Sequence, residues 1–220
     1  IYTMQSVDEA RAVVALGVDH VGVTPASQGL PGEISYGLAN DIVAAVKGIA
    51  TSVALTVDSD PATIVDMVRV VQPEILHLCG VPGAVSPYAV GSLRQALPAV
   101  GLMQAIAVTG PAAIDVARSY EPVVDYLILD SVDPSIPCVG AAGVVHDWEV
   151  SAAIVDSVDV PVILAGGLGP DNVADAIAAV RPWGVDSLTR TNRFVAGGRF
   201  RKDLDRVSAF REAAHTGGVG

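Results

Sequence analysis

Lysine is almost missing from this 220-residue chain, which has only Lys47 and Lys202. An enzyme that forms a Schiff base with its substrate therefore has very few candidates for its nucleophile. Cysteine is as rare, and two residues are too few for a disulfide scaffold, so we expect reduced thiols in a cytoplasmic protein. Aromatic residues make up only 5% of the chain, and the core must therefore come from Ala, Val, Leu and Ile.

Positive charge is also scarce, with 13 basic against 24 acidic residues and a net charge of −11. Nucleic acids and anionic membranes repel such a protein, so we expect neither as a partner. An anionic substrate must be held by local donors. No apolar run reaches the roughly 18 residues of a membrane span, and the four histidines lack the spacing of a zinc site. We therefore expect neither a metal nor another cofactor.

What the chain has in abundance is short apolar runs that alternate with Ala-rich helical stretches. This alternation predicts an α/β protein, a single-domain (β/α)8 TIM barrel formed by residues 1–220. Helices are expected at 6–16, 36–47, 62–71, 87–97, 112–120, from 147, at 170–180 and at 200–214. The predicted strands are 1–4, 19–23, 52–57, 75–78, 102–108, 125–129, 160–165 and 184–188.

Two patterns indicate where chemistry takes place. The run 160–191 contains Gly166-Gly167 between a strand and a helix, and glycines there let backbone N–H groups approach an anion. A tight turn explains the same glycines. Asp130 and Asp58 each follow a predicted strand, at the barrel face that carries active sites. Either could instead cap a loop or helix.

Several motifs together resemble the phosphoribosylanthranilate isomerase family, over nearly the whole chain. That resemblance implies a (β/α)8 barrel that converts an N-ribosyl phosphate aldose to the ketose by an Amadori rearrangement. The motifs are Leu129-Asp130-Ser131, Asp147-Trp148, Leu164-Ala165-Gly166-Gly167-Leu168 with Pro170 and Asn172-Val173, Pro182 with Gly184-Val185-Asp186, and Lys202-Asp203.

The resemblance assigns roles but is weaker at the functional positions. Asp130 matches the family's general acid. Tyr2 stands where the family has its base, a cysteine, and Leu30-Pro31-Gly32 replaces the motif whose arginine meets the anthranilate carboxylate. On strand four the family's Gln-Leu-His-Gly becomes His77-Leu78-Cys79-Gly80. Arg190 stands in place of a glycine of the family's phosphate site.

The candidate site residues follow from these patterns. The general acid is Asp130, and the phosphate is assigned to Gly166, Gly167, Thr189 and Arg190, whose guanidinium can bind it bidentately. The base remains open among Tyr2, Asp58, Cys79 and Cys138. The alternative for Tyr2 is that it fills the space of the lost cysteine, and the alternative for each cysteine is the role of a small buried apolar residue.

These assignments predict an isomerase of a small phosphorylated sugar derivative other than phosphoribosylanthranilate itself, acting in the cytoplasm as a monomer or homodimer. One alternative is a lyase, aldolase or epimerase on a phosphorylated metabolite. The other is a ligand-binding barrel without catalysis.

Overall fold

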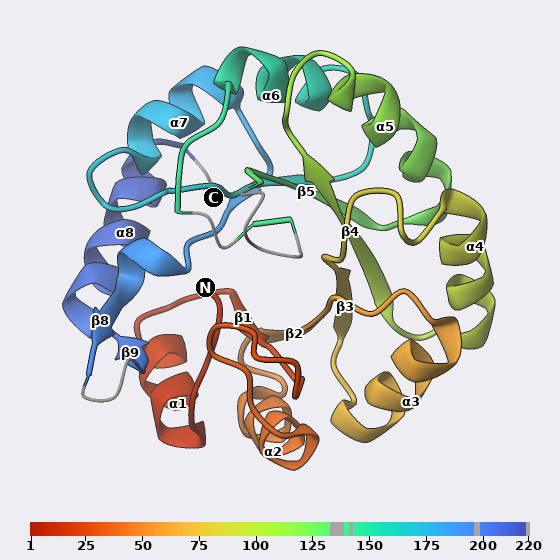
Figure 1. Ribbon diagram of the computed structural model, residues 1–220. Coiled ribbons are helices and arrows are strands. Elements are labelled where there is room, and N and C mark those ends of the chain that lie inside the picture. Colours follow the sequence, from red (N-terminus) through yellow and green to blue (C-terminus); the bar gives the residue numbers. More distant parts are fainter. Residues whose placement is uncertain (133–138, 141–142, 196–198, 219–220) are drawn as a thin grey trace.

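The computed structural model describes residues 1–132, 139–140, 143–195 and 199–218. Seven parallel strands form one sheet in which neighbours in the chain are neighbours in space. These are β1 (His20–Val23), β2 (Thr51–Thr56), β3 (Ile75–Leu78), β4 (Gly101–Ala107), β5 (Tyr126–Asp130), β6 (Val162–Leu164) and β7 (Gly184–Val185). The sheet curls into a barrel inside a ring of helices (Figure 1).

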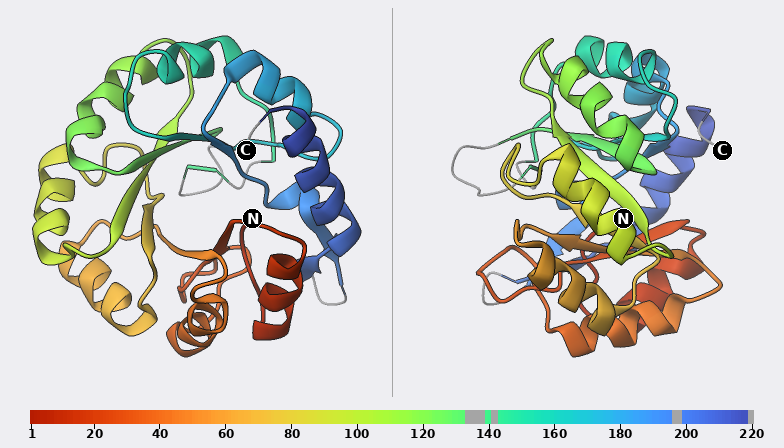
Figure 2. Two further views of the ribbon diagram at one scale, coloured as in Figure 1. Left: turned by 180° about the vertical axis from the view of Figure 1, so that it is seen from behind. Right: turned by 90° about the vertical axis from the view of Figure 1, so that its right-hand side faces the viewer.

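The helices alternate with these strands, and the turned views show them wrapping the sheet from outside (Figure 2). The α-helices are α1 (Val7–Ala15), α2 (Tyr36–Val46), α3 (Pro61–Val71), α4 (Pro87–Ala96), α5 (Ala113–Tyr120), α6 (Trp148–Val155), α7 (Val173–Val180) and α8 (Leu204–Thr216). Two short 3₁₀ turns are η1 (Glu121–Val123) and η2 (Thr189–Thr191).

Residues 1–4 close the barrel. Met4 N donates to Gly22 O (2.9 Å), Gly22 N donates to Ile1 O (2.9 Å), and Tyr2 N reaches Ser187 O at 3.4 Å. The segment therefore lies between β1 and the end of β7, in the place of the predicted first strand. The (β/α)8 fold is confirmed.

The helix starts follow the capping residues in the sequence. The side chains of Ser6, Asp60 and Ser86 each accept a hydrogen bond from the backbone N–H three residues later. Each bond satisfies one of the donors that the first helical turn leaves open, so the start of the helix is set locally.

The predicted last helix begins too early. Phe200–Lys202 is strand β9, which pairs antiparallel with β8 (Asn192–Phe194), and α8 begins at Leu204 after its N-cap Asp203. The physical reason is that residues 200–202 form backbone hydrogen bonds with residues 192–194 in a hairpin. The helical pattern of residues 204–214 contains no signal for this pairing, so the start of the helix was placed too early.

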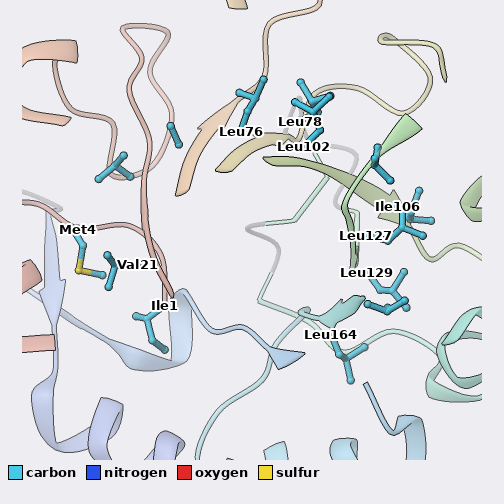
Figure 3. Packing of buried hydrophobic residues seen from close by; sticks show 14 of the residues in the cluster. Ile1, Met4, Val21, Leu76, Leu78, Leu102, Ile106, Leu127, Leu129 and Leu164 are labelled. Carbon is cyan, nitrogen blue, oxygen red and sulfur yellow. The ribbon is translucent and has the colours of Figure 1, made fainter. Parts of the chain in front are cut away.

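Alternation along the strands produces two apolar layers. The residues that fill the barrel interior are odd-numbered on β3 and β4, such as Ile75 and Met103, and even-numbered on β5, such as Ile128. Even-numbered residues on β3 and β4, and odd-numbered ones on β5, form one cluster with the buried residues of the helices. Leu76, Leu102 and Leu127 of this cluster are labelled in Figure 3. In the part of the chain that is described, no helix is long and apolar enough to cross a membrane.

Candidate active site

The barrel interior opens into a small cavity at the carboxyl ends of the strands. Its position follows from the alternation, because Asp130 comes two residues after the inward Ile128, and His77 two after Ile75. The cavity is lined by Tyr2, Thr3, Thr24, Leu30, Pro31, Leu55, Val57, His77, Cys79, Ile128, Asp130, Val139, Gly140, Asp186 and Leu188.

Asp130 presents to this cavity a carboxyl group with a raised pKa. Burial raises the pKa of Asp130 to about 7, although the Ser131 N–H donates to its Oδ1 at 2.7 Å and this hydrogen bond opposes the rise. The negative charge of Asp186 adds to the rise. At neutral pH Asp130 is therefore partly protonated, which is the state that a general acid needs.

Gly140 covers the Asp130 carboxyl. Its N–H donates to Ser131 O (2.8 Å), and its φ is +93°, in the region that favours glycine. A Cβ at this position would lie 2.4 Å from Asp130 Oδ2. Backbone without a side chain is thus required for the acid to keep its place at the cavity wall.

Tyr2 and His77 form a buried pair. The Tyr2 hydroxyl lies 2.9 Å from His77 Nδ1. Burial raises the pKa of Tyr2 well above its usual value and lowers the pKa of His77 to about 3, so both groups are neutral at pH 7. The Tyr2 ring also fills the space beside Gly22, where a Cβ would lie 2.2 Å from it. This arrangement favours the space-filling role for Tyr2 over that of a base.

The other candidate bases are placed differently. Asp58 accepts hydrogen bonds from Gln28 Nε2 at 3.2 and 3.3 Å in an exposed loop, and the cavity is lined by its neighbour Val57 instead. The structure does not bring Asp58 to Asp130. The thiol of Cys79 donates to Val139 O at 2.8 Å inside the cavity wall. Cys138 lies outside the described residues.

A second hollow adjoins the first, between the turns after β6 and β7. Gly166 and Gly167 adopt φ of +84° and +63°, and Asn172 Nδ2 donates to Gly167 O (3.1 Å). Ser187 Oγ donates to Leu168 O (2.7 Å) and joins the two turns. The hollow is lined by Asp130, Gly143, Ala165, Gly166, Gly167, Leu168, Asp186, Ser187, Leu188 and Thr189.

Thr189 lines this hollow, but Arg190 does not. The Arg190 guanidinium pairs with Asp171, with Nη1 2.9 Å from Oδ2, and its side chain is 40% exposed. It lines an outer groove together with Pro170 and Arg206. Three of the four expected phosphate residues therefore come together, and the fourth lies at the outer rim.

Sequence reasoning missed two residues of this region. Asp186 lines both hollows and comes directly after β7, whereas the predicted strand 184–188 placed it inside a strand and so hid its position at the strand end. Lys202 is buried behind the turn that carries Thr189, and its link to this turn becomes visible only through the hydrogen bond of its side chain to Leu188 O. Among the described residues no group of three or more His, Cys, Asp or Glu side chains is placed to hold a metal ion.

Comparison with sequence profiles and curated relatives indicates one family. The sequence profile of N-(5'-phosphoribosyl)anthranilate (PRA) isomerase matches residues 3–188. The enzyme of that name from Methanocella arvoryzae is 35% identical over 93% of this chain and 92% of its own, and that from Haloferax volcanii is 37% identical over 94% and 88%.

A solved PRA isomerase in complex with reduced 1-(o-carboxyphenylamino)-1-deoxyribulose 5-phosphate has the same fold. Its TM-score is 0.74 at 24% identity, over 97% of this chain and 95% of that one. With the sequence profile and the relatives in agreement, the chain belongs to the N-(5'-phosphoribosyl)anthranilate isomerase family.

Proposed function

We propose that this protein isomerises N-(5'-phosphoribosyl)anthranilate to the corresponding 1-deoxyribulose 5-phosphate. The single observation that carries the proposal is the 35% identity to a PRA isomerase over almost the full length of both chains. The replaced motif residues had favoured a different sugar derivative as substrate. Nothing in the comparisons indicates one, so PRA itself is the substrate to test first.

The chemistry begins at Asp130. Its protonated carboxyl donates to the ribose ring oxygen, the bond from that oxygen to C1 breaks, and the nitrogen lone pair forms an iminium with C1. Removal of the C2 proton then gives the enamine, which becomes the ketone by proton transfer. The pKa of about 7 supports this role, since the acid is protonated in a useful fraction near neutral pH.

For the base we propose Asp186. It lines both hollows, and its negative charge contributes to the raised pKa of Asp130. Two carboxyl groups at one site, one of them held protonated by its surroundings, are a recurring acid–base arrangement. The neutral Tyr2–His77 pair, and the fact that Asp58 does not line the cavity, support this choice over Tyr2 and Asp58.

The phosphate is assigned to the second hollow, between Gly166, Gly167 and Thr189, with Arg190 at its rim. Glycines with positive φ allow backbone N–H groups to approach an anion without obstruction. The relative solved with a ribulose 5-phosphate shows that a protein of this fold binds such a group. A phosphate there and a ribose beside Asp130 would occupy the two adjoining hollows.

The test is a PRA isomerase assay of the purified protein, with complementation of a tryptophan auxotroph that lacks the isomerase. We expect turnover that falls by about 10²- to 10⁴-fold in Asp130→Asn and in Asp186→Asn, the range of a general acid or base. Asp66→Asn, which changes an exposed aspartate of α3, is the matched control and should leave turnover unchanged.

Absence of turnover and of complementation would refute PRA as the substrate. Product analysis with a panel of sugar phosphates then separates a lyase or epimerase from a barrel that only binds its ligand.

We also propose that residues 1–220 act as one cytoplasmic domain on this small phosphorylated metabolite. Light scattering after size-exclusion chromatography decides between monomer and homodimer.

A further inference from the structure

Lys202 is a buried ammonium group at the edge of the proposed phosphate hollow. It lies on β9 and is 3% exposed. Its Nζ donates to Asn192 Oδ1 at 2.6 Å, to Leu188 O at 3.2 Å and to Thr191 Oγ1 at 3.4 Å. All three of its hydrogens thus have acceptors within reach, and the side chain is fixed in one position.

These contacts hold the turn that follows β7. Leu188 directly precedes the 3₁₀ turn η2 and Thr191 is its last residue, and this turn carries Thr189 at the wall of the hollow. Asp203 N donates to Thr191 O at 2.9 Å and fixes the same turn from the start of α8. Lys202 therefore determines where this wall of the hollow stands.

The charge of Lys202 is also arranged for an anion. In the described chain the hydrogen-bond partners of its Nζ are neutral oxygens. The nearby Arg190 and Arg206, by contrast, lie 2.9 and 3.8 Å from carboxylate oxygens of Asp171 and Asp203. The positive charge of these arginines is thus largely offset. The Asp186 carboxyl group also lines the hollow and pairs with the Ile1 ammonium group at 3.4 Å, which leaves the Lys202 ammonium group to balance an anion that enters.

Burial makes this ammonium costly to maintain. It lowers the pKa of Lys202 to about 7, and the negative charges of Asp186 and Glu9 only partly oppose that effect. A protein that needed only hydrogen bonds here could use a neutral side chain at a lower cost.

We propose that Lys202 is a positioning residue for anion binding, which both fixes the turn at Thr189 and supplies the positive charge that the phosphate of the substrate requires. The inference rests on the proposed function for the identity of the substrate. It names sulfate or phosphate monoester as the chemical class that the hollow binds.

Three variants separate charge from hydrogen bonding. Lys202→Arg keeps the charge, Lys202→Gln keeps donors without charge, and Lys202→Met keeps neither. Lys47→Gln, at the exposed end of α2, is the matched control for loss of one lysine. Sulfate is the probe, because it does not titrate between pH 5 and 9, and its Kd is measured by calorimetry at about pH 6.

We expect Lys202→Gln and Lys202→Met to weaken sulfate binding by about tenfold or more, since a buried charge near an anion acts at low effective dielectric. Lys202→Arg should restore binding to within about threefold of the wild type. With PRA the neutral variants should raise KM by a similar factor and change kcat by less than about threefold. Lys47→Gln should change none of these values.

The inference would be overturned if the wild type and Lys202→Gln bound sulfate equally well, or if kcat fell at unchanged KM. PRA turnover by the wild type would in that case still support the proposed function. Sulfate binding that depends on Lys202, in a protein that does not turn over PRA, would support the inference and refute the proposed function. If Lys202→Met fails to fold, the comparison of Lys202→Gln with Lys202→Arg still tests whether the charge is needed. A wild type that binds no sulfate and shows no Lys202 effect on KM also refutes it.

Discussion

Replacing Asp130 by asparagine tests in one variant both the burial of this carboxyl and its use. The amide has nearly the same shape and its oxygen can still accept the Ser131 N–H, but it does not ionise. The pKa of Asp130 is about 7 in the folded protein and 3.8 in its ordinary state. Because the folded protein binds this proton more tightly than the unfolded chain, the group's contribution to stability is complete below about pH 4 and is lost as the pH rises through 7.

The magnitude follows from these two values. A difference of about 3 in pKa, at about 1.4 kcal/mol for each pKa unit, corresponds to about 4 kcal/mol. We therefore expect the free energy of unfolding of Asp130→Asn, relative to the wild type, to rise by about 4 kcal/mol between pH 4 and pH 8. All other titrating groups are present in both proteins, so the difference isolates Asp130.

The assay is urea unfolding followed by circular dichroism at half-unit steps of pH. The same variant should lose isomerase activity, and kcat/KM of the wild type should fall about tenfold for each pH unit above 7. A difference in unfolding free energy that does not change with pH would show that Asp130 is solvated, and the reasoning about the acid would then be refuted.

Three further predictions concern the cavity and its rim. Tyr2→Phe should cost about 1–3 kcal/mol in urea unfolding, because His77 Nδ1 loses its buried partner, while kcat changes little; a loss of kcat by orders of magnitude would instead identify Tyr2 as the base. Gly140→Ala should lower both stability and kcat, since its Cβ would lie 2.4 Å from Asp130 Oδ2; unchanged kinetics would contradict the close contact. Arg190→Gln should raise KM for PRA by less than about fivefold, because its guanidinium is engaged in an exposed ion pair, and a much larger rise would show that it binds the phosphate directly.

Local patterns were enough to predict most of the barrel. Ser6, Asp60 and Ser86 begin helices where the sequence places them, because a cap depends on atoms within three residues. The same holds for the strand end at Asp130, whereas Asp186 falls inside the predicted strand 184–188 and β7 ends before it, at Val185. The hairpin of β8 and β9 escaped prediction, since pairing with another strand has no signal in residues 200–202 alone.

The candidate site was only partly predictable, for a related reason. Nothing near Arg190 in the sequence shows that Asp171, 19 residues earlier, takes up its charge. Tyr2 and His77 are 75 positions apart in the sequence, and the burial that brings them together keeps both neutral. Such contacts change what a side chain can do, and they exist only after the strands have been brought together.

By itself the sequence determined the order of strands and helices, the barrel they form, and the strand end that presents Asp130, because periodicity and capping act over a few residues. Only the tertiary structure decided which groups are buried, which charges are offset and which turn Lys202 holds. Desolvation and pairing depend on distances between residues far apart in the chain, and closing the barrel through residues 1–4 sets those distances.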